Sequence, residues 1–194
     1  MAGVKRTMLV LVLLVGALLG VRLLLGGDKQ AEQSAKPRLR VIYEGRWGHV
    51  DLPNGFRLWL PAGWEFDRQR GRGYIFRRIE EVDGFHPNVH VYWFRDPTPF
   101  GDWFKSQRSK RRGGGTKILN EGEETTTGRR GKFLIYETKS EQPGGELLTV
   151  TKDWLFFGSG GYKGILRCIS TARTFLEPYH AIFNEVHARL KKPN

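Results

Sequence analysis

The sequence is poor in the residues that cross-link small proteins or bind transition metals. Cys168 is the single cysteine of the 194 residues, so no intrachain disulfide can form. The five histidines do not form a metal-ligand pattern, because Pro87 breaks the pair His86 and His90 and no third ligand accompanies His180 and His187. These absences exclude a disulfide-stapled scaffold, and neither a metal site nor a cofactor is expected.

A recognisable set of catalytic residues is also lacking. Cys168 lies within an apolar run and is interpreted as a buried structural thiol. Ser159 lies between glycines, but Phe157 stands where a nucleophile elbow needs its first glycine. The glycines of residues 158–164 fit neither a dinucleotide nor a Walker loop and are typical of a hairpin turn. We therefore predict a non-enzyme. A pocket gathering His180, His187 and a carboxylate would instead indicate a hydrolase or metal-dependent enzyme.

One long hydrophobic run stands at the start of the chain. Lys5 and Arg6 precede an apolar stretch, residues 8–25, that is interrupted by glycines and by Arg22. As a helix it would be about 27 Å long, close to the roughly 30 Å of a bilayer's hydrocarbon core. We predict a membrane anchor or signal segment over 1–26, a linker over 27–40 and a globular domain over 41–194. A cleaved signal peptide and a buried core helix stay as alternatives, although no A-x-A-like cleavage site is evident.

The orientation of the anchor follows from its flanking charges. Lys5 and Arg6 favour a cytoplasmic N-terminus, whereas Lys29, Lys36 and the arginines that follow crowd the other flank. The start of the chain resembles a signal sequence in its short basic segment. We expect a single-pass membrane protein whose globular domain lies outside the cytoplasm. A secreted soluble protein after signal cleavage is the alternative.

The chain is strongly basic. It carries 32 Lys and Arg against 20 Asp and Glu, a formal net charge of +12. Such a body is attracted to an acidic protein partner or an anionic membrane surface, unless its charges form only a solvated surface. The predicted contact residues lie in a strand-and-loop segment, at a helix end and in a turn: Arg68, Arg70, Arg72, Arg77, Arg78, Arg108, Lys110, Arg111, Arg112, Arg129 and Arg130.

Nucleic-acid binding on a cytoplasmic face is an alternative function. The segment 72–79 partly fits the basic-Gly-aromatic signature of an RNA-recognition strand. Ile75 stands where the signature has a small residue, and Arg77 where it has an aliphatic one. We consider nucleic acid an improbable partner for a membrane-tethered domain outside the cytoplasm.

Alternating apolar residues and turn signals predict mainly antiparallel strands. Asn54-Gly55 predicts a hairpin turn between two of them, and glycine-rich turns predict an antiparallel meander in the second half of the chain. The expected strands cover residues 47–52, 56–60, 73–79, 88–94, 117–127, 132–138, 147–157 and 162–170.

Two helices are expected as well. Thr98 and Pro99 predict the N-cap and first position of a helix that the glycines of 113–115 end. Thr174 and Glu177 fit a capping box at the start of the last helix. The apolar stripe of that helix recurs at helical spacing and predicts a core-facing surface: Phe175, Tyr179, Ile182, Phe183, Val186 and Leu190.

Two short segments carry a resemblance to a known family. A strand followed by Pro61-Ala62-Gly63-Trp64 resembles the opening of PsbP-like domains, and residues 170–175 leading into an amphipathic helix resemble their ending. The resemblance covers about Val41 to Leu190 and extends to Mog-type and DcrB-like domains. It implies an α+β fold, an α/β/α sandwich around an antiparallel sheet, and docking to partners rather than turnover. No photosystem-specific residue is recognised, so no functional residue is carried over.

Overall fold

The computed structural model describes residues 39–53, 55–112, 115–126, 129–143, 145–157 and 161–191. These residues belong to one compact unit, Leu39–Asn194. The predicted anchor and all but the last two residues of the predicted linker lie outside the described residues. Among those described, no helix combines the length and the apolar character that crossing a bilayer requires.

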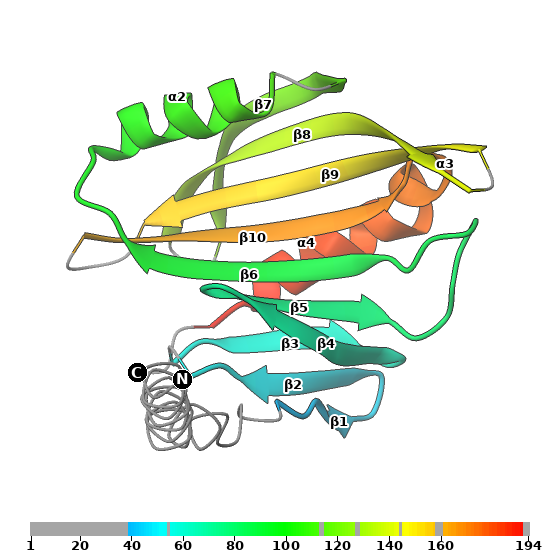
Figure 1. Cartoon of the computed structure of the whole chain (residues 1–194). Coiled ribbons are helices and arrows are strands. Elements are labelled where there is room, and N and C mark those ends of the chain that lie inside the picture. Colours follow the sequence, from blue (N-terminus) through cyan, green and yellow to red (C-terminus); the bar gives the residue numbers. More distant parts are fainter. Residues whose placement is uncertain are drawn as a thin grey trace, which may run out of the picture. The chain divides into compact units, whose positions relative to one another are not determined.

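The strands form two antiparallel sheets (Figure 1). The small sheet has the order β1-β2-β3, and the large sheet has the order β4-β5-β6-β10-β9-β8-β7. The strands are β1 (Ile42–Glu44), β2 (Trp47–Asp51), β3 (Arg57–Pro61), β4 (Trp64–Arg70), β5 (Gly73–Arg78), β6 (Asn88–Arg95), β7 (Thr116–Thr126), β8 (Arg129–Gln142), β9 (Gly145–Phe157) and β10 (Tyr162–Thr171). The helical elements are α2 (Phe100–Lys110), α3 (Ala172–Thr174), the π-helical turn η2 (Phe175–Tyr179) and α4 (His180–Arg189). The α+β class and the antiparallel pairing are therefore confirmed.

The large sheet is covered by different elements on its two faces. Leu155 of β9 packs with Trp103 of α2, whereas its neighbour Trp154 packs with Phe183 of α4 and with the small sheet. Adjacent residues of a strand point to opposite faces, so α2 and α4 lie on opposite sides of the sheet (Figure 1). The core on the α4 side is the larger one, and α2 covers only part of its own face.

The predicted strands are confirmed to within a few residues, but two strands, β1 and β4, were missed. β1 has only three residues and all of them are exposed, so no apolar alternation marks it. β4 follows the turn Pro61-Ala62-Gly63, which marks the end of the preceding strand in the sequence. Gly63, at φ +84°, reverses the chain there and Trp64 enters the other sheet. A register shift between Phe66 and Arg68 then breaks the alternation within β4.

The predicted N-cap of the first helix is wrong. Pro99 is the N-cap of α2, and no side chain caps the helix. The backbone N–H of Thr98 instead donates to Asp96 Oδ1 at 2.9 Å, which forms a turn before the helix. The buried stripe of α2 includes Trp103 and Phe104, as the sequence predicted.

The predicted capping box at the last helix is wrong as well. Helical structure begins at Ala172, and Glu177 has the extended angles φ −141° and ψ 127°. Pro178 disfavours helical angles at the residue before it, so Glu177 cannot serve as the third residue of a regular helix. Thr174 Oγ1 contacts Thr171 Oγ1 at 2.8 Å instead of capping. The apolar stripe nevertheless faces the core, with Ile182 partly buried beside it.

Candidate functional site

Five residues form a row across the large sheet on the face that α2 partly covers. In strand order β4, β5, β6, β10 and β9, the row consists of Arg68, Ile75, His90, Arg167 and Asp153. Residues directly opposed on neighbouring strands point to the same face, so all five side chains leave the sheet on one side. We call them the cross-strand row. It extends about 19 Å, since neighbouring strands lie about 4.8 Å apart.

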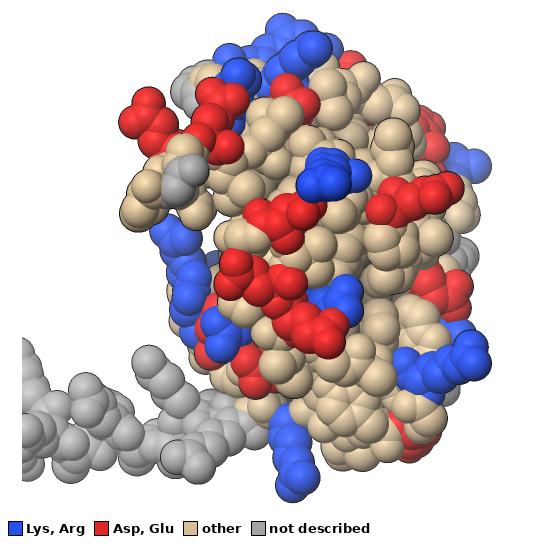
Figure 2. Space-filling view, turned by 90° about the vertical axis from the view of Figure 1, so that its right-hand side faces the viewer, with Lys and Arg blue, Asp and Glu red and all other residues tan. Residues whose placement is uncertain are grey.

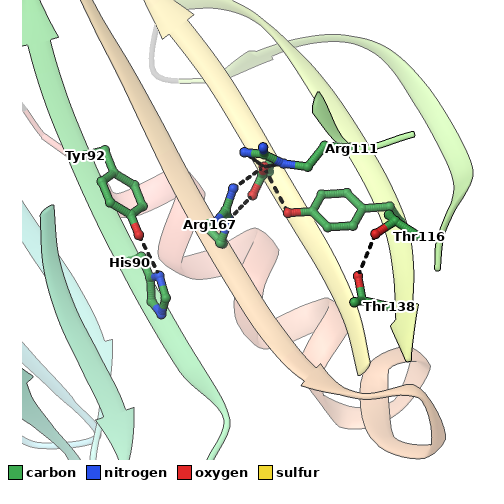
Figure 3. A network of polar contacts seen from close by, with 8 residues as sticks. His90, Tyr92, Arg111, Thr116, Thr138 and Arg167 are labelled. Carbon is green, nitrogen blue, oxygen red and sulfur yellow. Dashed lines mark hydrogen bonds and ion pairs between the residues drawn. The ribbon is translucent and has the colours of Figure 1, made fainter. Parts of the chain in front are cut away.

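A buried carboxylate lies at one end of the cross-strand row. Arg167 Nε donates to Asp153 Oδ1 at 2.7 Å and its Nη2 donates to Oδ2 at 2.8 Å. Arg111, just after α2, reaches the same Oδ2 from Nε at 3.4 Å and from Nη2 at 3.3 Å. The Tyr136 hydroxyl donates to Oδ2 at 3.2 Å. Figure 3 shows Arg111 and Arg167 converging from different elements. Two guanidinium groups thus share one carboxylate, and an excess positive charge remains.

The protonation states of this cluster follow from its burial and its charges. Burial would raise the pKa of Asp153, but the attraction and hydrogen bonds of Arg167, joined by Arg111, outweigh it and hold the pKa below its usual value. Burial raises the pKa of Tyr136, and the Asp153 charge raises it further. Burial acts against the charged form of Arg167, yet Asp153 raises the pKa of the guanidinium above its usual value. At neutral pH the cluster therefore holds two cations, one anion and a neutral phenol.

Tyrosine rings hold the two guanidinium groups in place. The Arg111 guanidinium lies 5.8 Å from the centroid of the Tyr136 ring, and the Arg167 guanidinium lies 5.8 Å from that of Tyr92. Each arginine side chain keeps 19 % of its surface exposed, whereas Asp153 keeps 1 %. The arginines therefore cover the carboxylate while their outer edges stay accessible to solvent.

His90 occupies the middle of the cross-strand row as a neutral imidazole. Its Nδ1 is hydrogen-bonded to the Tyr92 hydroxyl at 3.0 Å (Figure 3). Burial lowers the pKa of His90 to about 4, and the nearby positive charges of Arg167, Arg68 and Arg70 act in the same direction. The lowered pKa of His90 is consistent with an electropositive face.

A pocket of about 250 Å³ adjoins the other end of the row. Ile75 and Phe85 give it apolar walls, and the Asn88 amide nitrogen donates to the His86 carbonyl at 3.0 Å. The Asn88 Oδ1 atom is buried and has no hydrogen-bond partner among the described residues. The full lining comprises Asp67, Arg68, Ile75, Arg77, Gly84, Phe85, His86, Asn88 and His90.

The structure gathers some of the predicted contact residues on this face. Arg68 and Arg70 lie on β4 and Arg111 follows α2, whereas Arg77 of β5 is paired with Glu65 at 3.0 Å. We call the surface made by these four arginines and the cross-strand row the open face. Arg72 is exposed in the β4–β5 turn beside it.

The other predicted contact residues lie elsewhere. Arg78 donates to the Tyr179 hydroxyl at 2.6 Å on the α4 side, and Arg108 is paired with Glu121. Lys110 and Arg112 are exposed near the end of α2, and Arg130 is exposed at the β7–β8 hairpin. The side chain of Arg129 lies outside what the structure describes. Sequence reasoning missed Arg167 and Asp153, although Arg167 is a lone charge within an apolar strand, which was a signal for that residue.

The side chains of the RNA-like segment do not form a stacking surface on the open face. Tyr74 and Phe76 point to the opposite side of β5 from Ile75, and Phe76 is fully buried in the core. The geometry therefore gives no support to base stacking at Phe76.

No group of three or more His, Cys, Asp or Glu side chains could hold a metal ion within the part of the chain that the structure describes. His187 Nδ1 lies 3.5 Å from Glu124 Oε1, whereas His180 Nε2 lies 3.5 Å from the Asn184 amide nitrogen. Burial raises the pKa of Cys168, so its thiol stays protonated at neutral pH.

Charges of both signs lie on the surface of the domain (Figure 2). Figure 2 shows Lys and Arg interspersed with Asp and Glu on the side of the domain that it displays. A positive net charge therefore does not imply a uniformly basic surface, and particular clusters must be considered one by one.

No family model and no curated protein sequence matches the chain. Solved structures do match its fold. LpqN of Mycobacterium tuberculosis, described as involved in cell envelope biogenesis, aligns with a TM-score of 0.55 and 11 % identity over 72 % of this chain and 83 % of LpqN. The cyanobacterial PsbP protein CyanoP of Synechocystis sp. PCC 6803 aligns with a TM-score of 0.54 and 13 % identity over 78 % of this chain and 95 % of CyanoP.

A third solved structure is similar in the same way. PA94 of Pseudomonas aeruginosa, a protein of unknown function described as a putative regulator, aligns with a TM-score of 0.50 and 15 % identity over 77 % of this chain and 100 % of PA94. The domain therefore has the PsbP-like fold, which confirms the resemblance of its opening and closing segments at the level of the fold.

Proposed function

We propose that the protein is a membrane-tethered, non-catalytic binding module of the cell envelope that docks an anionic partner on its open face. One observation carries this proposal: Arg111 and Arg167 share the single carboxylate of Asp153 at a partly accessible surface. The uncompensated positive charge attracts an anion that can approach the outer edges of these guanidinium groups.

The remaining charges of the open face support the same function. Among the described residues, Arg68 is exposed and forms an ion pair only with the neighbouring Asp67, at 3.1 Å, and Arg70 is exposed with no ion-pair partner. Exposed ion pairs contribute about 0–1 kcal/mol, so Arg68 can exchange Asp67 for an incoming anion at little cost. Arg68 and Arg70 therefore extend the positive region beyond the buried cluster.

The chemistry of the open face favours binding over turnover. Asp153 is held as an anion by its arginines, and Tyr136 stays protonated because burial raises its pKa. His90 is neutral and is bonded to Tyr92 rather than to a nucleophile. Groups held this firmly in one protonation state are suited to positioning a ligand and poorly suited to proton transfer at neutral pH.

The location in the envelope rests on two separate arguments. Residues 8–25 predict an anchor, which lies outside the described residues, and flanking charges favour a domain outside the cytoplasm. LpqN, which shares the fold, is described as involved in cell envelope biogenesis. Both arguments favour an envelope protein, and neither identifies the partner.

The proposal is tested with the full-length chain in mild detergent and a fluorescently labelled ten-residue polyglutamate as the anionic probe. We expect binding that weakens as salt is raised and that falls about tenfold in the double variant Arg68→Glu, Arg70→Glu. The double variant Arg40→Glu, Arg46→Glu is the matched control, since it reverses two exposed arginines beside the small sheet, which packs on the other face of the large sheet.

Two results would contradict the proposal. One is the absence of salt-dependent binding by the wild-type protein. The other is an equal loss in the Arg40→Glu, Arg46→Glu control, which would show that net charge rather than the open face determines affinity.

A further inference from the structure

We infer that the partner presents an extended acidic peptide that crosses the strands along the cross-strand row, with carboxylates at positions i and i+4 and an apolar residue at i+2. This inference deepens the proposed function and rests on it, because it uses the same open face. It specifies the chemical class of the partner and the spacing of its charges.

The spacing follows from sheet geometry. Arg167 and Arg68 are three strands apart in the row, a separation of about 14 Å at about 4.8 Å per strand. In an extended peptide, residues i and i+4 point to the same side and lie about 13–14 Å apart. One carboxylate can therefore meet Arg111 and Arg167 while the other meets Arg68.

Arg111 is the group best suited to take the first carboxylate. Its hydrogen bonds to Asp153 measure 3.3 and 3.4 Å, against 2.7 and 2.8 Å for Arg167. The longer contacts indicate that Arg167 satisfies most of the charge of Asp153. Arg111 can thus bind a second carboxylate without leaving the first one uncompensated.

The middle of the row suits an apolar side chain. Position i+2 lies about 7 Å along the peptide, between His90 and Ile75 and beside the pocket that Phe85 also lines. Ile75 and Phe85 give this pocket apolar walls, and its volume of about 250 Å³ leaves room for one aliphatic side chain.

A narrow chain also fits the depth of the site better than a flat membrane does. The side chains of Arg111 and Arg167 are only 19 % exposed. Beside them α2 lies on the sheet, and a helix with its side chains is about 10–12 Å across. A planar bilayer would meet α2 first, whereas a single extended strand can lie next to it on the sheet.

The experiment compares two peptides of identical composition and charge on the full-length chain in mild detergent. The first is acetyl-Glu-Ser-Leu-Ser-Glu-amide, which has the inferred spacing. The second is acetyl-Glu-Glu-Leu-Ser-Ser-amide, which places the carboxylates side by side. With fluorescent labels on both, we expect the first to bind at least tenfold more tightly than the second.

Substitutions connect this preference to the row. Arg68→Glu should bring the two affinities to within about twofold of each other, because the second carboxylate loses its partner. Arg46→Glu, in the turn between β1 and β2 of the small sheet, should leave the tenfold preference unchanged. A preference that persists in Arg68→Glu would overturn the inferred path of the peptide.

Other outcomes overturn the inference and separate it from the proposed function. Equal, salt-dependent binding of both peptides by the wild-type protein would refute the spacing but leave anionic docking in place. Salt-dependent binding of the soluble short-chain lipid dihexanoyl phosphatidylglycerol, lost in Arg68→Glu and with neither peptide bound, would identify a lipid headgroup as the partner and refute the peptide. If neither peptide, nor this lipid, nor polyglutamate binds, both proposals fail.

Discussion

Arg167 and Asp153 lie directly opposite each other on β10 and β9, and their side chains form a two-point ion pair over the sheet. Directly opposed, oppositely charged residues stabilise an antiparallel pair. Here the pair is also buried, so each charge depends on the other for compensation. The same two residues therefore stabilise the sheet and determine the charge of the open face.

We predict that Asp153→Asn destabilises the fold strongly. The variant keeps the shape of the side chain but leaves two partly buried guanidinium groups facing each other without an anion. Removing one partner of a buried ion pair costs about 3–5 kcal/mol. Urea unfolding followed by tryptophan fluorescence would measure this change in the free energy of unfolding.

The comparison variant is Arg111→Met. Its contacts with Asp153 are long, and Arg167 still compensates the carboxylate, so a loss of about 1 kcal/mol is expected. Equal losses for the two variants would show that the carboxylate depends on Arg111 as much as on Arg167.

Local sequence patterns were sufficient for much of the fold. The hairpin of β2 and β3 and the meander of β7 to β10 join strands that are neighbours in sequence, and turn residues mark each reversal. β4 escaped prediction because its alternation is broken between Phe66 and Arg68. The predicted capping box is wrong because Pro178 keeps Glu177 out of helical angles, although helical structure already begins at Ala172.

The candidate site was only partly predictable, for a different physical reason. The segment containing Arg68 and Arg77 and the one containing Arg111 were recognised as basic. Which arginines share a face depends on β10 pairing with β6, and these strands are far apart in the sequence. Arg111 and Asp153 are separated by 42 residues, so no local pattern connects them.

A second prediction concerns close packing across the sheet. Gly164 of β10 lies opposite Phe156 of β9, and a Cβ atom added at Gly164 would lie 2.3 Å from the Phe156 ring. The ring is buried and cannot move aside freely. Gly164→Ala should therefore lower the free energy of unfolding by about 1–3 kcal/mol, as overpacking of a core does.

Gly101→Ala in α2 is the matched control. Nothing lies within 4 Å of the added Cβ atom at Gly101, which is exposed. Both variants restrict the unfolded chain in the same way. In addition, alanine is more favourable than glycine in a helix by up to about 1 kcal/mol, which applies to Gly101→Ala. Thermal unfolding should show a lower Tm for Gly164→Ala and an unchanged or higher Tm for Gly101→Ala. The reverse order would contradict the packing argument.

A third prediction concerns the loop between β6 and α2. Lys163 Nζ donates to the Asp96 carbonyl at 2.7 Å and to Asp96 Oδ1 at 3.0 Å, and it also reaches the Thr98 carbonyl. The lysine side chain is 4 % exposed. Lys163→Met keeps most of its volume but leaves these acceptors without their donor, so a loss of about 2–3 kcal/mol is expected.

The carboxyl group of Asp96 gives an independent measurement of the same contact. Hydrogen bonds from Thr98, followed by that from Lys163, lower the pKa of Asp96 to about 2. In Lys163→Met the pKa of Asp96 should rise toward its ordinary value, which an NMR titration of the carboxyl carbon would detect. An unchanged pKa would mean that Thr98 alone maintains the shift.

The last prediction is that the fold loses stability as the pH falls from about 6.5 to 4. Burial, followed by the charge of Lys152, lowers the pKa of His187 to about 3, and burial with nearby arginines lowers the pKa of His90 to about 4. An unfolded histidine has a pKa of about 6.5, so in this range the unfolded chain binds more protons than the folded one. Each such histidine lowers the free energy of unfolding by up to about 1.4 kcal/mol for every unit by which the pH falls.

His187→Gln tests the larger of these contributions. The variant removes the titrating ring beside Glu124 and Lys152, so the slope of the free energy of unfolding against pH should fall by about 1 kcal/mol per pH unit between pH 6 and 4.5. Unfolded Glu and Asp side chains begin to gain protons at the lower end of this window, but they do so in both proteins, so their contribution cancels in the difference between the two slopes. Urea unfolding at each pH gives the free energy of unfolding, and the slope is the change of this free energy with pH. A loss of stability that is the same at every pH shifts all the values equally, so it does not affect the slope. A slope identical to that of the wild-type protein would mean that His187 gains its proton in the folded state as readily as in the unfolded chain.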